Sequence, residues 1–164
     1  MSIRVKKNYL IFKGKQFKCS IGKSGFSINK KEGDGCTPVG TFYIENVYYR
    51  ADKIKSLETN INKVKINKID GWCDDPSQKE YNQLINFPYD FSAEELYRED
   101  SLYNIVCVLN YNTNPVKPGI GSAIFIHVAK EGYKPTEGCI ALKQEDLIFL
   151  LSFIDKKTKI ILGD

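Results

Sequence analysis

Apolar and polar positions alternate along most of the chain with a period of two, which is typical of β-strands that bury one face. β-Branched and aromatic residues supply the apolar positions, and lysines supply many of the polar ones. Gly, Asn, Asp and Pro separate the runs, as expected for turns. The strands that this pattern predicts lie at residues 3–12, 17–21, 26–28, 41–49, 64–66, 103–110, 123–128 and 158–162.

Two segments have a helical pattern instead. Residues 145–154 place their apolar residues on one face, and Glu145 and Asp146 suit the positive end of the helix dipole. Residues 92–99 predict a shorter helix, with a capping box formed by Ser92 and the glutamate three residues later. Residues 70–88 contain many turn-forming pairs and predict a long irregular loop. The fold class is therefore mainly β, with one long and one short helix.

The length and charge of the chain exclude several classes of function. A chain of 164 residues is expected to form one domain spanning 1–164. The net charge of +4 is modest and its lysines are scattered, so no basic stripe with stacking aromatics predicts nucleic-acid binding. Residues 1–10 carry charges where a secretory signal would be apolar, so we expect no signal peptide, no membrane span and a cytoplasmic location. Export by another route would instead place the protein in the periplasm or cell envelope.

The cysteine pattern argues against a metal site or a disulfide framework. The chain has five cysteines, an odd number, and no CxxC pair. We expect them to be reduced, with Cys107 inside an apolar run as a small core residue. No metal-ligand set and no phosphate-binding loop is found, so no cofactor is expected.

The single histidine, His127, ends an apolar run and is followed, after eleven residues, by Cys139. A free thiol with a pKa of about 8.5 is only a few per cent thiolate near neutral pH, and an imidazole within reach supplies the missing base. The alternative is a buried cysteine and a histidine with a purely structural role. Gly138 favours the catalytic interpretation, because glycine allows close backbone approach and nearby amides can stabilise an oxyanion.

Two motifs carry a resemblance to a known family. His127 followed by Thr136-Glu137-Gly138-Cys139 resembles the signature of L,D-transpeptidase catalytic domains. The segment 35–42, Gly-Cys-Thr-Pro-Val-Gly-Thr-Phe, resembles that family's Gly-x-Thr-Pro-x-Gly-x-Phe motif, about a hundred residues upstream in the usual order. The resemblance spans most of the chain and implies a single-domain β-sandwich or barrel.

The resemblance also implies a reaction and its residues. Cys139 would attack the amide between meso-diaminopimelate and D-alanine in peptidoglycan stem peptides or muropeptides, leaving a thioester. His127 would serve as general base and then as general acid. The amides of Gly138 and Cys139, with that of Glu137, would form the oxyanion hole.

The chain departs from the family pattern at three places. Glu137 stands where the family has a histidine, and Ala141 stands where it usually has an arginine. The segment between His127 and Cys139 is shorter than is usual in the family. His127 is therefore expected to be the only general base. Arg50 or Arg98 is expected to bind a substrate carboxylate, because a guanidinium can donate two parallel hydrogen bonds to it. Arg50 is favoured, because the segment Arg50-Ala51-Asp52 resembles one in a compact form of the family.

Further candidates for substrate binding come from a resemblance to a compact form of the family. It covers the segment 72–76, Trp-Cys-Asp-Asp-Pro, and Tyr81-Asn82. Asp74 or Asp75 is a candidate partner for the diaminopimelate ammonium, although an aspartate before proline is also ordinary turn chemistry. Trp72 and Tyr81 are substrate contacts or core residues. Thr136 and Glu137, beside the cysteine, are expected to contact substrate.

The acyl acceptor distinguishes three hypotheses. Release of the thioester to water would make the protein an L,D-carboxypeptidase of muropeptide recycling, which the short segment beside the cysteine favours. Transfer to an amine would make it a crosslinking L,D-transpeptidase. A module that binds muropeptides without turnover is the third possibility.

Overall fold

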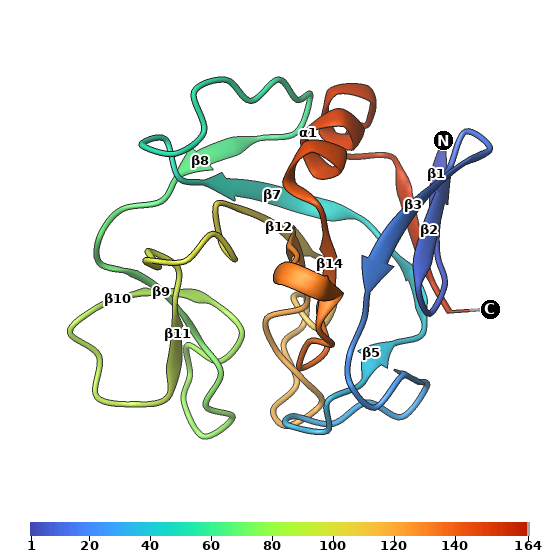
Figure 1. The fold of residues 1–164 in the computed structure, drawn as a ribbon. Helices are drawn as coiled ribbons and strands as arrows, with labels where there is room; N and C mark the ends of the chain where they lie inside the picture. Colours follow the sequence, from blue (N-terminus) through green and yellow to red (C-terminus); the bar gives the residue numbers. More distant parts are fainter. Residues whose placement is uncertain (164) are drawn as a thin grey trace.

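The computed structural model describes residues 1–163, which form one large curled β-sheet, two small sheets and one α-helix (Figure 1). In spatial order, the large sheet contains β6 (Gly40–Phe42), β15 (Lys159–Leu162), β1 (Ser2–Val5), β2 (Tyr9–Phe12), β3 (Lys15–Ser20), β14 (Ile140–Leu142), β13 (Phe125–Val128), β12 (Ile105–Leu109), β7 (Ile44–Tyr49) and β8 (Lys63–Lys65). The small sheets contain β10 (Leu84–Asn86), β9 (Asp70–Cys73) and β11 (Ala93–Glu95), and β4 (Phe26–Ser27) with β5 (Thr37–Pro38). The mainly β fold class predicted from the sequence is confirmed.

Strand alternation places the predicted apolar residues inside. In β3, Phe17 and Cys19 are buried, whereas Gln16 and Lys18 are exposed. The predicted strand at 3–12 is two strands, because the chain turns where the Lys6 amide donates to the carbonyl oxygen of Tyr9 at 2.8 Å. The sheet is therefore built from shorter strands than the apolar pattern indicated.

The long helix is confirmed as α1 (Gln144–Phe153), which buries Leu147, Leu150 and Leu151. The short helix at 92–99 is wrong. Residues 93–95 form β11 and pair antiparallel with β9. The backbone amides and carbonyls of this segment therefore form hydrogen bonds in a sheet instead of in a capped helix. Among residues 1–163, α1 is the only α-helix, and it is too short and too polar to cross a membrane.

The segment 70–88 is also more ordered than predicted. It contains β9 and β10, which pair with Trp72 opposite Leu84. All four residues of β9 are buried. Of the turn-forming groups in this segment, those at 74–76 and 81–82 lie between the two strands, Asp70-Gly71 lies within β9, and Phe87-Pro88 follows β10.

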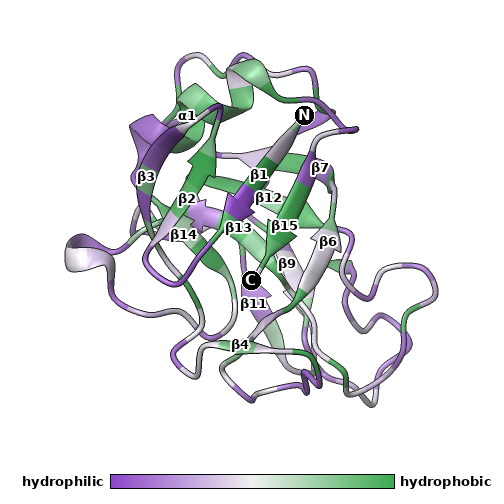
Figure 2. Cartoon of the chain, turned by 90° about the vertical axis from the view of Figure 1, so that its right-hand side faces the viewer, coloured by the Kyte–Doolittle hydropathy of each residue, from purple (hydrophilic) through white to green (hydrophobic). Residues whose placement is uncertain are grey.

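The two faces of the large sheet carry two cores. One contains α1 and includes Cys107, which is fully buried as expected. The other lies under the small sheet of β9, β10 and β11 and includes Trp72 and Phe125. Figure 2 shows hydrophobic residues concentrated on the central strands and α1, with hydrophilic loops around them.

One row of residues crosses the centre of the large sheet. Ser20, Ala141, His127, Val106 and Tyr48 face one another in register on β3, β14, β13, β12 and β7. Residues directly opposite each other project to the same face of a sheet. His127 therefore lies on the face that the small sheet covers.

Candidate active site

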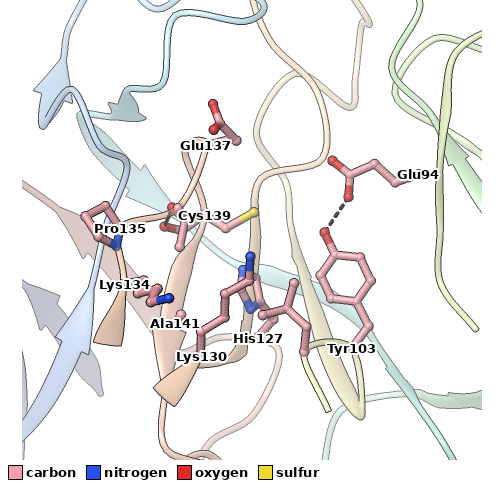
Figure 3. A pocket seen from close by; sticks show the side chains of 11 residues that line it. Glu94, Tyr103, His127, Lys130, Lys134, Pro135, Glu137, Cys139 and Ala141 are labelled. Atoms are coloured by element: carbon pink, nitrogen blue, oxygen red, sulfur yellow. Dashed lines mark hydrogen bonds between the residues drawn. The ribbon is translucent and has the colours of Figure 1, made fainter. Parts of the chain in front are cut away.

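Cys139 and His127 line one cavity of about 150 Å³ (Figure 3). His127 belongs to β13, and Cys139 directly precedes β14, the parallel neighbour of β13. The register pairs His127 with Ala141, two residues after the cysteine. Strand pairing therefore brings together the two residues that the sequence predicted as nucleophile and base.

His127 is held in one tautomer. Its Nδ1 lies 2.8 Å from the carbonyl oxygen of Val128, which only accepts hydrogen bonds, so Nδ1 carries the proton and Nε2 bears the lone pair. Burial lowers the pKa of His127 to about 4, which keeps the imidazole neutral near neutral pH. The ring of Tyr103 packs edge-on against it, with centroids 5.3 Å apart. The imidazole is thus fixed in the form that accepts a proton.

The thiol of Cys139 is protonated at rest. It donates to the carbonyl oxygen of Ala123 at 3.0 Å and accepts from the amide of Phe125 at 3.4 Å. Burial, and next the charge of Glu94, raise the pKa of Cys139 to about 12. Within residues 1–163 these are its hydrogen bonds, so the resting site pairs a neutral thiol with a neutral imidazole.

Two threonine hydroxyls fix the turn before the cysteine. Thr136 Oγ1 donates to the carbonyl oxygen of Cys139 at 2.6 Å and accepts from the amide of Gly138 at 3.1 Å. Thr37 Oγ1 donates to the carbonyl oxygen of Gly138 at 2.8 Å. The φ of Gly138 is 147°, and a Cβ there would lie 2.8 Å from the carbonyl oxygen of Cys36. The structure therefore requires glycine at this position.

One of the three amides predicted to form an oxyanion hole already has a hydrogen-bond partner within the turn. The amide of Gly138 is used by Thr136. The amides of Glu137 and Cys139 have no hydrogen-bond partner among residues 1–163. These two amides, rather than that of Gly138, are the free donors beside the sulfur.

A second cavity, of about 230 Å³, is also lined by Cys139 and is mainly acidic. It shares Cys139 and Glu94 with the first cavity and adds Glu32 and Asp74. Its one cation, Lys30, is paired with Asp34 at 2.8 Å. Asp74 Oδ1 is buried and has no hydrogen-bond partner among residues 1–163.

Only one of the two predicted aspartates lies at the site. Asp74 lines the acidic cavity. Asp75 instead accepts hydrogen bonds from the amide and hydroxyl of Ser77, at 2.9 and 2.7 Å, and lines neither cavity. Its role is the turn chemistry that was the alternative interpretation.

Glu94 and Tyr103 belong to the site, although the sequence analysis did not identify them. The Tyr103 hydroxyl donates to Glu94, and both residues line the cavity of His127 and Cys139 (Figure 3). Burial raises the pKa of Glu94 above the ordinary value of a glutamate. No local motif marks either residue, because they come from β11 and from the segment before β12.

Arg50 is a structural residue, which corrects the expectation that it holds substrate. It is buried, and its guanidinium donates to both carboxylate oxygens of Asp52 at 2.8 and 2.7 Å and to the carbonyl oxygen of Arg98 at 2.5 Å. It also stacks on Tyr97 at 3.5 Å. Arg50 lines neither cavity around the cysteine, and its Nε, Nη1 and Nη2 atoms each donate to Asp52 or Arg98.

Arg98, the other arginine considered, is bound to Asp100 at 2.8 and 2.7 Å. The cations that line the cavity of His127 and Cys139 are Lys130 and Lys134. They are the groups placed to attract a substrate carboxylate. Neither lysine was predicted as a site residue.

Trp72 and Tyr81 are buried, and hydrogen bonds link each of them to residues that line the acidic cavity. Trp72 Nε1 donates at 3.0 Å to Asn82 Oδ1, which also accepts from the amide of Ala123 at 2.9 Å. The Tyr81 hydroxyl donates to Glu32 at 2.5 Å and accepts from the amide of Gly121 at 3.1 Å. Neither aromatic ring lines a cavity around the cysteine, so the core interpretation holds for both.

The remaining predicted contacts surround the cysteine. Glu137 lines both cavities and forms an ion pair with Lys23 at 2.8 Å. The side chain of Thr136 also lines the first cavity, but its hydrogen bonds hold the turn. No group of three or more His, Cys, Asp or Glu side chains within residues 1–163 is arranged to hold a metal ion.

Comparison with known proteins identifies the family. Residues 4–162 match the YkuD family, described as the L,D-transpeptidase catalytic domain. None of the curated proteins compared with the chain matches it. The solved structure titled "Structure of the Ldtfm-avibactam carbamoyl enzyme" is 14% identical, with a TM-score of 0.46, over 99% of this chain and 48% of that one. The chain thus spans about half the length of that structure. Because the family match extends over nearly all of the sequence, the chain belongs to the YkuD family of L,D-transpeptidase catalytic domains.

Proposed function

We propose that the protein cleaves the amide bond between meso-diaminopimelate and D-alanine in peptidoglycan stem peptides through a Cys139 thioester, and that water resolves this thioester. The protein would then be an L,D-carboxypeptidase acting on muropeptides. The observation that carries the proposal is the shared cavity of Cys139 and His127, in which the imidazole is neutral and its Nε2 is unprotonated.

The proposed steps use groups already in place. The thiol proton passes to Nε2 of His127 while the sulfur bonds to the carbonyl carbon, and the carbonyl π electrons move to oxygen. The amides of Glu137 and Cys139 stabilise this oxyanion. When the carbon–nitrogen bond breaks, the imidazolium returns the proton to the amine of D-alanine. Water then attacks the thioester with His127 as base, and the thiol is restored.

Two features favour water as the acceptor. The cavity around His127 and Cys139 measures only about 150 Å³, which suits a small leaving group followed by water. The segment 128–138 that borders it contains only eleven residues and one short 3-10 turn, η1 (Glu131–Tyr133). Because this segment is short, it covers little of the thioester, and water can reach it.

Incubation of the full chain with a disaccharide-tetrapeptide tests the proposal. We expect release of D-alanine, accumulation of the tripeptide and no crosslinked dimer, measured by liquid chromatography and mass spectrometry. Cys139→Ala should abolish release, whereas Cys36→Ala, which removes another partly buried thiol, should retain it. Formation of a dimer would identify the protein as a crosslinking transpeptidase instead.

A carbapenem provides a second test, because its acylation requires both an activated sulfur and an oxyanion hole. We expect a covalent adduct on Cys139, detected by intact-mass and peptide mass spectrometry, and none in Cys139→Ala. Folded protein that forms no adduct and releases no D-alanine would be a muropeptide-binding module without catalysis.

A further inference from the structure

A third cavity, of about 480 Å³, is lined by residues of the segment 130–136, which also borders the candidate active site. Pro135 lines both this cavity and the one that holds His127 and Cys139. The floor of the third cavity includes Ser20, which stands in register with Ala141 and, one strand further, with His127. The two cavities therefore open on the same face of the large sheet.

The charged side chains that line this cavity are all lysines, and one of them, Lys23, is ion-paired with Glu137. Lys7, Lys18 and Lys23 line it, and no Asp or Glu does. We call it the lysine cavity. The Lys18 ammonium lies 4.7 Å from the centre of the Tyr133 ring, which turns the side chain toward the segment beside the active site. The acidic cavity is lined by Cys139, whereas the lysine cavity is not, and the two cavities differ in the sign of their charge.

The lysine cavity also contains a polar group that the fold leaves unsatisfied. Ser20 is 6% exposed, and its hydroxyl has no hydrogen-bond partner among residues 1–163. Buried hydroxyls nearly always have a partner, and those that lack one need an explanation. Rotation of the Ser20 side chain would turn this donor toward a ligand oxygen bound in the cavity.

The floor of the cavity is bonded to the turn that carries the nucleophile. The amide of Lys23 donates to the carbonyl oxygen of Thr136 at 2.8 Å. The amide of Thr136 donates to the carbonyl oxygen of Ile21 at 3.0 Å. The side chain of Thr136 in turn holds Gly138 and Cys139. A group bound in the cavity would therefore lie against the same backbone that positions the sulfur.

From these observations we propose that the lysine cavity binds a carboxylate of a stem peptide outside the reacting amide, with Lys7, Lys18 and the Ser20 hydroxyl as its donors. The inference rests on the proposed function, because it assigns a second anchoring point to the substrate of the same site. Stem peptides carry such a carboxylate on the D-glutamate, and a second stem peptide would carry one at its carboxyl terminus. The acidic cavity would then face the amine of the diaminopimelate residue.

Titration of the full-length Cys139→Ala protein with two tetrapeptides tests this assignment without turnover. One peptide carries D-glutamate and the other D-isoglutamine, in which an amide replaces that carboxylate. We expect the first to shift the backbone amide resonances of Ser20, Gly22 and Tyr133 and to bind about fivefold to tenfold more tightly than the second. If these resonances saturate together with those around residue 139, the carboxylate belongs to the donor peptide. If they saturate separately, it belongs to a second peptide.

Three variants in the Cys139→Ala background sharpen the test. Lys18→Gln should remove the preference for the carboxylate, whereas Lys68→Gln, an exposed lysine far from the cavity in sequence and absent from its lining, should retain it. Ser20→Ala should weaken peptide binding without lowering the melting temperature, because it removes a buried hydroxyl that makes no bond in the fold.

The outcomes separate this proposal from the function on which it rests. Shifts confined to residues around 139, with equal affinity for both peptides, would overturn the lysine cavity as a carboxylate site while leaving the proposed reaction intact. No shifts anywhere, together with no release of D-alanine by the unmodified chain, would overturn the proposed function itself.

Discussion

The hydroxyl of Thr37 donates a 2.8 Å hydrogen bond to the carbonyl oxygen of Gly138, across a hundred residues of sequence. Thr37 is fully buried and also accepts a 2.9 Å hydrogen bond from the amide of Gly22. The Thr-Pro motif near the start of the chain is thus a support for the turn that precedes the nucleophile. This contact gives a physical reason for the two motifs to occur together.

Replacement of Thr37 by valine should lower D-alanine release at least about tenfold, with a loss of about 1–2 kcal/mol in the free energy of unfolding. The isosteric side chain leaves the Gly138 carbonyl oxygen and the Gly22 amide without their partner. Thr158→Val is the matched control, because Thr158 is equally buried but bonds to Asp155, outside both cavities around the cysteine. Equal activity losses in the two variants would contradict a specific role for Thr37.

The charge of Glu94 is expected to suppress ionisation of Cys139. Its carboxylate raises the pKa of the thiol, second only to burial. Glu94→Gln keeps a hydrogen-bond acceptor for Tyr103 but removes the charge, so alkylation of Cys139 by iodoacetamide at pH 8 should be about threefold to tenfold faster. The measurement is the rate of labelling of the Cys139 peptide by mass spectrometry. Glu95→Gln, an exposed neighbour, is the control, and an unchanged rate in Glu94→Gln would refute the effect.

Burial of neutral His127 should make the fold sensitive to acid. The pKa of its imidazole falls from an ordinary 6.5 to about 4, so the unfolded chain binds a proton in this window that the folded chain does not. The contribution of His127 to stability is therefore present above pH 6.5 and is lost as the pH falls, by about 3 kcal/mol at pH 4. Guanidinium unfolding of the unmodified chain and of His127→Gln at pH 7 and pH 4 measures this difference. Parallel losses in the two proteins would show that other groups account for the acid sensitivity.

Substitutions at Arg50 and at Lys134 should have different effects, the first on the stability of the fold and the second on substrate binding. Arg50→Met removes the hydrogen bonds of a buried guanidinium to the half-exposed Asp52 and to the carbonyl oxygen of Arg98, and should lower the free energy of unfolding by about 2–3 kcal/mol while leaving KM unchanged in the folded protein. Lys134→Met should raise KM several-fold with little change in stability, because the exposed Lys134 lines the cavity of the cysteine. KM values from D-alanine release and melting temperatures test the pair. The opposite pattern would restore Arg50 as the carboxylate ligand.

The sequence by itself determined the parts of this protein that depend on local pattern. Period-two alternation predicted most strands of the large sheet, and one apolar face with acidic residues at its start predicted α1. The residue types His127, Gly138 and Cys139 predicted a thiol nucleophile with an imidazole base, and the resemblance to a known family predicted the reaction. The family match over residues 4–162 agrees with the resemblance that these residues carried.

Only the tertiary structure decided which of the remaining polar residues meet at the sulfur. Asp74 reaches the acidic cavity, whereas its neighbour Asp75 caps a turn. Glu94 enters the site because residues 93–95 pair with β9 instead of forming a helix. Strand register and the packing of one sheet on another set these positions through contacts between residues far apart in the chain, and no local periodicity contains that information.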